Sequence, residues 1–371
     1  MKAVSIVGAR PQFVKAAVVH RALREYPEVN AILIHTGQHY DDGMSRIFFR
    51  ELDIPEPDYD LGIGSGSHGK QTGRMLIAIE DVLSQVRPDA VVVYGDTNST
   101  LAGALSAAKM VVPVLHVEAG LRSFNREMPE EINRVLTDHL SDLLFAPTDS
   151  AVMNLVREGV EEDHVYKVGD VMYDAALLYG DRAEARSKIL KQIQATPGSY
   201  ILTTVHRAQN TDCSERLFVI CETLRRLSET MTVIFPVHPR TRKVLELRGL
   251  MNRLGTVRLI DPVGYLDMVM LEKNARLVLT DSGGVQKEAF FYRVPCVTLR
   301  EETEWVELVE LGWNRLAAPA SIDSQWKVIE EALCCPPAQD AHPYGLGDAG
   351  QRIAELIVDQ YCNKSTTLSV V

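Results

Sequence analysis

The stretch LTDSGGVQKEAFF, residues 279–291, joins an apolar run to a helix-like segment through an acid, a serine and two glycines. Small residues at a helix start leave its first backbone N–H groups accessible, and these groups attract anions. A tight turn alone would explain the same residues, because short glycine motifs recur by chance. We interpret the stretch as a strand–turn–helix unit and as a candidate phosphate site. In that site Ser282, Gly283 and Gly284 would offer N–H groups, and Glu288 would accept from ribose hydroxyls.

Strand-length apolar runs of this kind alternate with helix-length amphipathic segments along the whole chain. The runs are continuously apolar, which is typical of parallel strands buried on both faces. The alternation predicts an α/β fold with two doubly wound, Rossmann-like domains and a cleft between them. The first series of runs covers residues 3–8, 31–37, 90–96, 113–120 and 143–148, and the second covers 200–206, 232–238, 257–262, 276–283 and 295–300.

The length of 371 residues suits two domains. We place the first domain at residues 1–169 and the second, opened by a polar helix over 181–194, at 170–350. A loop rich in proline and glycine precedes a last helix, which is free to pack back on the first domain. We therefore assign residues 351–371 to the first domain as well.

Composition excludes several classes of protein. With 46% hydrophobic and 24% charged residues the chain is an ordinary globular protein, and its net charge of −11 argues against a nucleic-acid partner. No apolar run approaches the ~20 residues of a membrane span, and the N-terminal run is too short for a signal peptide. The six cysteines show no zinc-site spacing. We expect a reduced, cytoplasmic protein without a metal or cofactor.

Polar clusters follow several predicted strands, at the edge where open α/β sheets bind ligands. GARPQFVK offers Arg10 and Lys15 to a phosphate, although both residues also suit a solvated helix start. YGDTNST and LHVEAGLRS place Asp96 and Glu118 at strand ends, with Asp96 just before a helix capped by Asn98 or Ser99. A carboxylate there costs stability unless it is paired or used in acid–base chemistry.

Two further clusters supply acidic and basic side chains. In MPEEINRVLTDHLSD, Pro129 suits the first position of a helix, and a helix start fully explains only one of Glu130 and Glu131. TTVHRAQN and FPVHPRTRK place His206 and His238 at strand ends. Two histidines without a third ligand at suitable spacing do not predict a metal site.

Taken together, these clusters resemble the non-hydrolysing UDP-N-acetylglucosamine 2-epimerase family. Eight motifs occur in the family's order: GARPQFVK, TGQHYDDGMS, YGDTNST, HVEAGLRS, PEEINRVLTDHLSDLLFAPT, VGDVMYDA, TVHRAQN and LTDSGGVQKEA. The resemblance implies two Rossmann-like domains of the GT-B type, with the last helix crossing back to the first. It also implies a homodimeric isomerase that inverts C2 of a UDP-2-acetamido sugar. The reaction would be anti elimination of UDP and re-addition through a 2-acetamidoglycal.

The resemblance also assigns roles by motif position. The reacting sugar is lined by Asp96, Glu118, Glu130 and His206. Phosphates are held by Arg10, Lys15 and the N–H groups of Ser282, Gly283 and Gly284, and ribose is bound by Glu288. Candidates for a second, activating substrate site are Gln38 and His39. Motif order does not decide which carboxylate removes the C2 proton.

The substrate is the point at which this chain departs from many family members. Trp305, in ETEWVE, stands where many members have an arginine. The pattern resembles relatives that act on UDP-2,3-diacetamido-2,3-dideoxyglucuronate, a precursor of bacterial surface polysaccharides. Trp305 would pack on the extra acetamido methyl group, and Arg240 in HPRTRK would pair with the sugar carboxylate. We favour this uronate over UDP-GlcNAc and UDP-ManNAc.

Three other functions are consistent with parts of the pattern. A GT-B glycosyltransferase shares the domain plan, but it needs an acceptor groove and usually one base, whereas three carboxylates are expected near C2 here. A non-catalytic nucleotide-sugar sensor would not need Asp96, Glu118, Glu130 and His206 together. A hydrolysing epimerase, which releases free N-acetylmannosamine, is disfavoured by the absence of a fused kinase domain.

Overall fold

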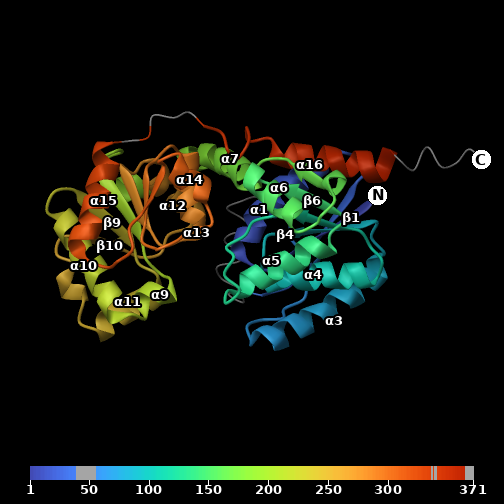
Figure 1. The fold of residues 1–371 in the computed structure, drawn as a ribbon, viewed down its shortest axis with the longest axis horizontal. Coiled ribbons are helices and arrows are strands. Elements are labelled where there is room, and N and C mark those ends of the chain that lie inside the picture. The colour runs from blue at the N-terminus through green and yellow to red at the C-terminus, as the bar shows by residue number, and fades with distance from the viewer. Residues whose placement is uncertain (39–55, 336, 338–340, 364–371) are drawn as a thin grey trace, which may run out of the picture. The chain divides into compact units, whose positions relative to one another are not determined.

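The computed structural model describes residues 1–38, 56–335, 337 and 341–363. The chain forms two compact units (Figure 1): unit 1 comprises Met1–Ala175 and His342–Val371, and unit 2 comprises Ala176–Ala341. The predicted boundaries, 169/170 and 350/351, differ from these points by six and nine residues. The first observed boundary falls inside helix α7 (Val171–Arg186), where no turn marks it.

Unit 1 is built on a parallel sheet with strand order β3-β2-β1-β4-β5-β6-β7. The order reverses between β1 and β4, so ligand-binding groups are expected beyond the carboxyl ends of these strands. β4 illustrates why the strands form, since all five of its residues are apolar and 0% exposed. The strands are β1 (Lys2–Val7), β2 (Asn30–His35), β3 (Tyr59–Asp60), β4 (Ala90–Tyr94), β5 (Val114–Val117), β6 (Leu143–Ala146) and β7 (Val165–Lys167).

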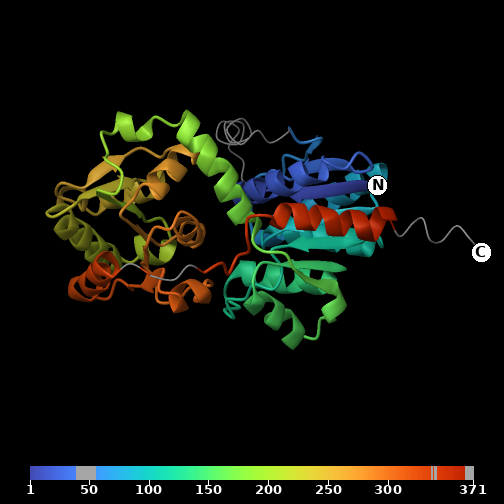
Figure 2. The ribbon, with the colours of Figure 1, turned by 90° about the horizontal axis from the view of Figure 1, so that it is seen from above.

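Helices cover the sheet of unit 1: α3, α4 and α5 pack side by side, and the last helix, α16, packs on α1 (Figures 1 and 2). The backbone N–H of Gly350 donates to Asp174 Oδ1 at 2.8 Å, which fixes the start of α16 in unit 1. The predicted return of the last helix is confirmed. The elements are α1 (Arg10–Leu23), α3 (His68–Val86), α4 (Asn98–Lys109), α5 (Pro129–Leu140), α6 (Asp149–Arg157), η1 (Glu162–His164), α16 (Ala349–Val358) and the π-helical turn η3 (Asp359–Asn363).

Unit 2 repeats the plan with a parallel sheet of order β10-β9-β8-β11-β12-β13, which reverses between β8 and β11. Its strands are β8 (Tyr200–Thr204), β9 (Thr232–Pro236), β10 (Arg258–Ile260), β11 (Leu277–Thr280), β12 (Cys296–Thr298) and β13 (Asn314–Leu316). Its helices after α7 are α8 (Ile189–Gln192), α9 (Ala208–Thr211), α10 (Ser214–Ser228), α11 (Pro239–Leu247), η2 (Met251–Arg253), α12 (Tyr265–Lys273), α13 (Gly283–Phe291), α14 (Val306–Glu310) and α15 (Ile322–Cys334). None of the described helices is long and apolar enough to cross a membrane.

All ten predicted strands are present, and every described strand pair is parallel, as the apolar runs indicate. The three strands that the sequence did not predict, β3, β7 and β13, each lie at a sheet edge and span only two or three residues. The helix predicted over 181–194 is interrupted, because the hydroxyl of Ser187 donates to Asp267 Oδ1 and accepts from Ile189 N. The chain therefore forms α7 and α8 instead.

Candidate active site

Asp96 lies in the turn that follows β4, directly before α4. Thr97, and not Asn98 or Ser99, caps α4: its hydroxyl accepts from Thr100 N. The Asp96 carboxylate is thereby left to pair with Arg134 of α5. Partial burial raises the pKa of Asp96 and the Glu118 carboxylate raises it further, whereas Arg134 and Lys15 oppose the shift. Asp96 therefore combines a raised pKa with partial access to solvent, as an acid–base group requires.

Glu118 follows β5 and has φ of 71°, a left-handed conformation that non-glycine residues rarely adopt. Strain of this kind concentrates at functional sites. The Glu118 carboxylate pairs with the ammonium of Lys15 from α1, and both side chains are 10% exposed. Lys15, which we expected to bind a phosphate, thus lies within the carboxylate cluster.

Glu130 and Glu131 are neighbours with different environments. Pro129 begins α5 as predicted, and Glu130 is exposed in the first turn. Glu131 is 3% exposed, and its carboxylate accepts from Ser123 N, Ser123 Oγ and Phe124 N, each at 2.9 Å. Glu131 therefore holds the preceding loop, while Glu130 is accessible to a ligand.

The remaining predicted residues of unit 1 lie near the starts of α1 and α4. Arg10 is the first residue of α1. Gln38 Oε1 accepts from Ser99 N at 3.0 Å and from Ser99 Oγ at 2.7 Å, so its amide is tied to the first turn of α4. His39, the other candidate for a second substrate site, lies outside the described residues.

In unit 2 the opening motif forms the predicted strand–turn–helix unit, with Ser282 between β11 and α13. The two glycines differ in what surrounds them. A Cβ atom at Gly283 would lie 2.5 Å from Glu304 Oε1, so a side chain there would require the Glu304 carboxylate to move. A Cβ atom at Gly284 would meet no atom of the described chain within 4 Å. Packing within unit 2 therefore gives no reason for the second glycine, and the space beside it is open.

His206 follows β8 and is held by Asp281, a residue that the sequence analysis did not select. His206 Nδ1 lies 3.3 Å from Asp281 Oδ1, and the N–H groups of His206 and Arg207 donate to the same carboxylate at 3.1–3.2 Å. Asp281 is 0% exposed. A carboxylate beside Nδ1 favours the tautomer that leaves Nε2 as a base. In the sequence, Asp281 could have been identified as the acidic residue directly after the apolar run in LTDSGG.

Glu288, the predicted ribose ligand, lies on α13 near a second carboxyl group. Burial raises the pKa of Glu288 to about 7, against the opposing effects of Lys287 and of the Tyr265 hydroxyl, which lies 3.5 Å away. Glu272 on α12 is 1% exposed, and neither carboxyl oxygen has a hydrogen-bond partner in the described part of the chain. Burial, aided by Glu288, raises the pKa of Glu272 well above its usual range.

The two residues proposed for substrate specificity make contacts within unit 2. Trp305 is 5% exposed, its indole N–H donates to the Gly283 carbonyl at 2.9 Å, and Lys287 Nζ lies 4.0 Å from the ring centroid. The indole of Trp305 therefore supports the start of α13, and its packing on the sugar stays a prediction. Arg240 is exposed and pairs with both carboxyl oxygens of Asp212 at 2.9 Å.

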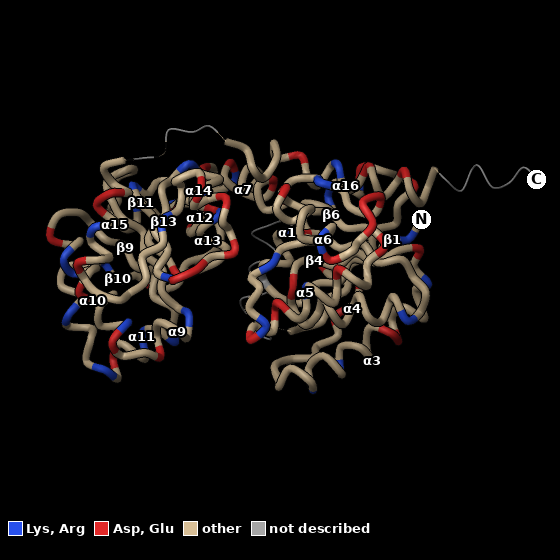
Figure 3. Tube along the Cα trace, in the orientation of Figure 1, with Lys and Arg blue, Asp and Glu red and all other residues tan. Residues whose placement is uncertain are grey.

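Each unit thus gathers part of the predicted site. Unit 1 brings Lys15, Asp96, Glu118 and Arg134 into mutual electrostatic contact. Unit 2 brings His206 to Asp281, which lies two residues before the first residue of α13. Lys and Arg are interspersed with Asp and Glu in both units (Figure 3). The cations beside the candidate carboxylates therefore belong to individual pairs and not to a large positively charged region. Among the described residues, no cluster of His, Cys, Asp and Glu could hold a metal ion.

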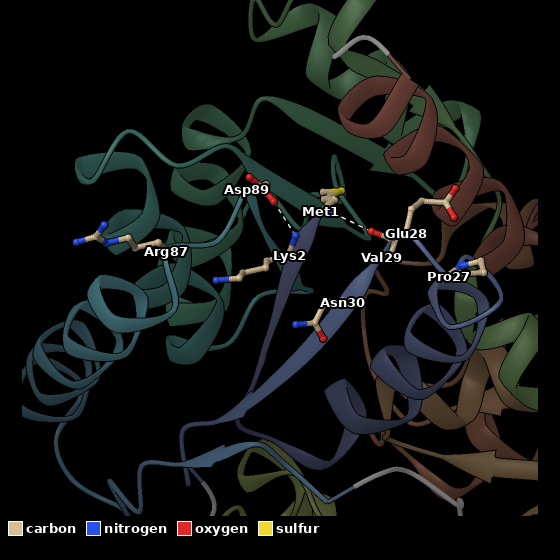
Figure 4. A pocket seen from close by; sticks show the side chains of 8 residues that line it. All are labelled: Met1, Lys2, Pro27, Glu28, Val29, Asn30, Arg87 and Asp89. Carbon is tan, nitrogen blue, oxygen red and sulfur yellow. Dashed lines mark hydrogen bonds between the residues drawn. The ribbon is translucent and has the colours of Figure 1, made fainter. Parts of the chain in front are cut away.

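A surface pocket of about 640 Å³ lies at the amino ends of β1 and β2, away from these groups (Figure 4). Its polar atoms hydrogen-bond within the chain: Lys2 N donates to Asp89 Oδ2 at 2.6 Å, and the N-terminal ammonium donates to the Glu28 carbonyl at 2.8 Å. None of the predicted site residues lines this pocket. The lining residues are Met1, Lys2, Pro27, Glu28, Val29, Asn30, Arg87 and Asp89.

Known proteins resemble this chain over nearly its full length. The profile of the family described as UDP-N-acetylglucosamine 2-epimerase matches residues 21–358. A UDP-N-acetylglucosamine 2-epimerase homolog of Methanococcus maripaludis is 52% identical over 363 residues, covering 96% of this chain and 99% of the relative. The UDP-2,3-diacetamido-2,3-dideoxy-D-glucuronate 2-epimerase of Pseudomonas aeruginosa is 51% identical over 360 residues, with the same coverage.

A solved structure supports the same relationship. The crystal structure of the Methanocaldococcus jannaschii UDP-GlcNAc 2-epimerase, in complex with UDP-GlcNAc and UDP, matches with a TM-score of 0.88 and 47% identity. The match covers 97% of this chain and 100% of that one. The predicted fold of the GT-B type and the predicted family are confirmed. The chain belongs to the UDP-N-acetylglucosamine 2-epimerase family of isomerases.

Proposed function

We propose that the chain is a UDP-2-acetamido-sugar 2-epimerase that inverts C2 by anti elimination of UDP and re-addition through a 2-acetamidoglycal. The observation that carries the proposal is the carboxylate cluster of unit 1. Asp96 and Glu118 lie at the ends of adjacent strands, each paired with a cation, and Glu118 helps to raise the pKa of Asp96.

The chemistry explains the need for several carboxylates. The C2 proton of a 2-acetamido sugar is weakly acidic, so a base must be positioned against it. Inversion then requires a proton to return to the opposite face, which calls for a second acid–base group. Asp96, Glu118 and the exposed Glu130 are the candidates in unit 1. A carboxyl group with a raised pKa, such as Asp96, exchanges a proton more readily near neutral pH.

The groups of unit 2 suit the departing UDP. The backbone N–H groups of Gly283 and Gly284 at the start of α13 would stabilise the negative charge that develops on the diphosphate, whereas the N–H of Ser282 already donates to Thr280 Oγ1 at 2.9 Å. Glu288 would accept from the ribose hydroxyls. His206, oriented by Asp281, would exchange a proton with the phosphate or the sugar.

Epimerisation in D2O tests the proposal. The purified protein is incubated with a UDP-2-acetamido sugar and no acceptor, and the product is analysed by NMR and mass spectrometry. We expect deuterium at C2 of the epimer, with traces of free UDP and the glycal. Retention of the original hydrogen at C2 would contradict the elimination mechanism. Turnover that needs an acceptor would indicate a glycosyltransferase, and release of free N-acetylmannosamine would indicate a hydrolysing epimerase.

For the substrate we propose UDP-2,3-diacetamido-2,3-dideoxyglucuronate in preference to UDP-GlcNAc. The proposal is supported by Trp305 in ETEWVE and by the relative of that name in Pseudomonas aeruginosa. Because the indole of Trp305 contacts Gly283 and Lys287, it would act by setting the start of α13.

Kinetic comparison of both substrates decides the point. We expect a higher kcat/KM for the uronate in the wild type and a smaller preference in Trp305→Arg. Trp305→Phe is the comparison variant, because it keeps an aromatic ring but loses the five-membered part of the indole, with the N–H donated to Gly283. A wild-type preference for UDP-GlcNAc would overturn the substrate proposal and leave the proposed reaction intact.

A further inference from the structure

Asp138, on α5, is a fully buried carboxylate that the proposed chemistry does not use. Its Oδ1 atom lies 2.6 Å from His116 Nδ1, and both side chains are 0% exposed. Its Oδ2 atom accepts from the backbone N–H of Gly120 at 3.1 Å and lies 2.7 Å from Arg122 NH1. His116, in β5, extends the network, since its Nε2 atom lies 2.8 Å from the Gly95 carbonyl oxygen.

This one carboxylate is therefore linked to both turns that carry the acid–base candidates. Gly95 immediately precedes Asp96, and Gly120 lies two residues after Glu118. Gly95 has φ of 62° and Glu118 has φ of 71°, so both turns contain left-handed backbone. Left-handed backbone at a non-glycine residue persists only when the surrounding structure holds it. The network through Asp138 and His116 supplies that support from inside unit 1.

The position of Asp138 on its helix makes the arrangement rigid. Residues four apart on a helix share a face and lie ~6 Å apart along its axis. Arg134, four residues before Asp138, pairs with the Asp96 carboxylate. Asp138 is linked through His116 to the carbonyl of Gly95, the residue before Asp96. One face of α5 thus fixes the side chain of Asp96 and the main chain that carries it.

Neighbouring residues stabilise the negative charge of the buried Asp138 carboxylate. Burial alone would raise the pKa of Asp138, but His116 and Arg122 outweigh burial and hold it below its usual value. Arg122 is in turn held by Glu158, through two hydrogen bonds of 2.7 Å. Glu158 adjoins the network at Arg122 and also lies 3.5 Å from His139 Nε2. It is a useful comparison, because its hydrogen bonds to Arg122 support the network from outside.

We propose that Asp138, acting through His116, is a positioning residue for epimerisation: it fixes the placement of Asp96 relative to Glu118. This inference rests on the proposed function. Asp138 need not touch the substrate. Its effect follows from the sensitivity of proton transfer to small errors in the geometry of the reacting groups.

The test measures kcat and KM for Asp138→Asn and His116→Gln beside wild type and Glu158→Gln. UDP affinity is measured by calorimetry and folding by thermal denaturation. We expect kcat to fall ~10-fold or more in the first two variants, with KM and UDP affinity within about threefold of wild type. Glu158→Gln should keep most of its kcat, because it loosens Arg122 and leaves both turns linked.

The outcomes separate the inference from the proposed function. A folded Asp138→Asn with wild-type kcat, or an equal loss of kcat in Glu158→Gln, would overturn the positioning role. If Asp138→Asn fails to fold, His116→Gln decides, because it leaves the contacts of Asp138 with Gly120 and Arg122 in place. A wild-type protein without epimerase activity would instead overturn the proposed function, and this inference with it.

Discussion

The two units hold their candidate groups by different means. In unit 1 side chains hold side chains, in the buried or partly buried pairs Lys15–Glu118 and Arg134–Asp96. In unit 2 the backbone dominates: main-chain N–H groups donate to Asp281, and no side chain caps the start of α13 in the described structure. The difference teaches where each unit is vulnerable. In unit 1 the removal of a charged group should reduce catalysis most. In unit 2 a larger side chain at the start of α13 should reduce UDP binding most.

The largest effects are expected from the acid–base groups. Asp96→Asn, Glu118→Gln, Glu130→Gln and His206→Ala should each lower kcat ~10²-fold or more, the usual scale for such groups. UDP affinity, measured by calorimetry, should change little in the three unit 1 variants. Glu80→Gln, at an exposed carboxylate of α3, serves as the control. Near-normal kcat in any of the four would remove that residue from the acid–base set.

The next effect concerns added bulk at the start of α13. Gly284→Val should weaken UDP binding at least ~10-fold, or about 1.4 kcal/mol, because its side chain would occupy the expected phosphate position. Thermal stability should change little, since a Cβ atom there meets no described atom within 4 Å. Gly283→Val is a less direct test of binding, because its Cβ atom would also displace the Glu304 carboxylate.

Ser282→Ala is the matched control for the helix start. It removes a hydroxyl that does not cap α13 in the described structure, and it leaves the backbone N–H in place. We expect only partial weakening of UDP binding. If Gly284→Val bound UDP as tightly as the wild type did, the helix start would not be the phosphate site.

Glu131 should show the reverse behaviour to Glu130. In Glu131→Gln an amide NH2 group would face the N–H groups of Ser123 or Phe124, so the free energy of unfolding should fall by ~1–3 kcal/mol. Urea denaturation measures this loss, while kcat of the folded variant should fall far less than in Glu130→Gln. Full stability combined with a large loss of kcat would exchange the roles assigned to the two glutamates.

The smallest effect is a pH dependence of UDP-sugar binding. The pKa of Glu288 is raised to about 7, and only its deprotonated form accepts from both ribose hydroxyls. Affinity should therefore rise as pH increases, by up to ~10-fold between about pH 6 and about pH 8. A UDP-sugar is used because its diphosphate does not titrate in this range. Glu288→Gln should abolish the dependence, and an unchanged slope in that variant would assign it to another group.

The comparison also separates what the sequence could predict from what it could not. Strands buried on both faces gave continuous apolar runs, so the central strands were predicted, whereas the short edge strands β3, β7 and β13 lacked that signal. The ends of those runs placed Asp96, Glu118 and His206 correctly at strand ends. The pairing of Lys15 with Glu118 spans 103 residues and that of Arg134 with Asp96 spans 38. No local pattern encodes contacts over such separations.

Two supporting residues, Asp281 and Asp138, were missed for different reasons. Asp281 directly follows a strand, and that position was a usable signal. Asp138 lies four residues after Arg134, but the spacing becomes informative only once Arg134 is known to face Asp96. The motif position of Trp305 did not predict that its indole is buried against Gly283.

The return of α16 to α1 has a consequence for synthesis on the ribosome. Unit 2 is complete in sequence before α16 is translated, whereas unit 1 requires both early and late segments. At ~5–20 residues per second, the surface of α1 around Val18, which Gly350 closely approaches, waits ~15–70 s until Gly350 is translated. During that time the apolar surface of α1 would be exposed and could be bound by a chaperone. Truncation before Ala349 would leave unit 1, and not unit 2, incompletely folded.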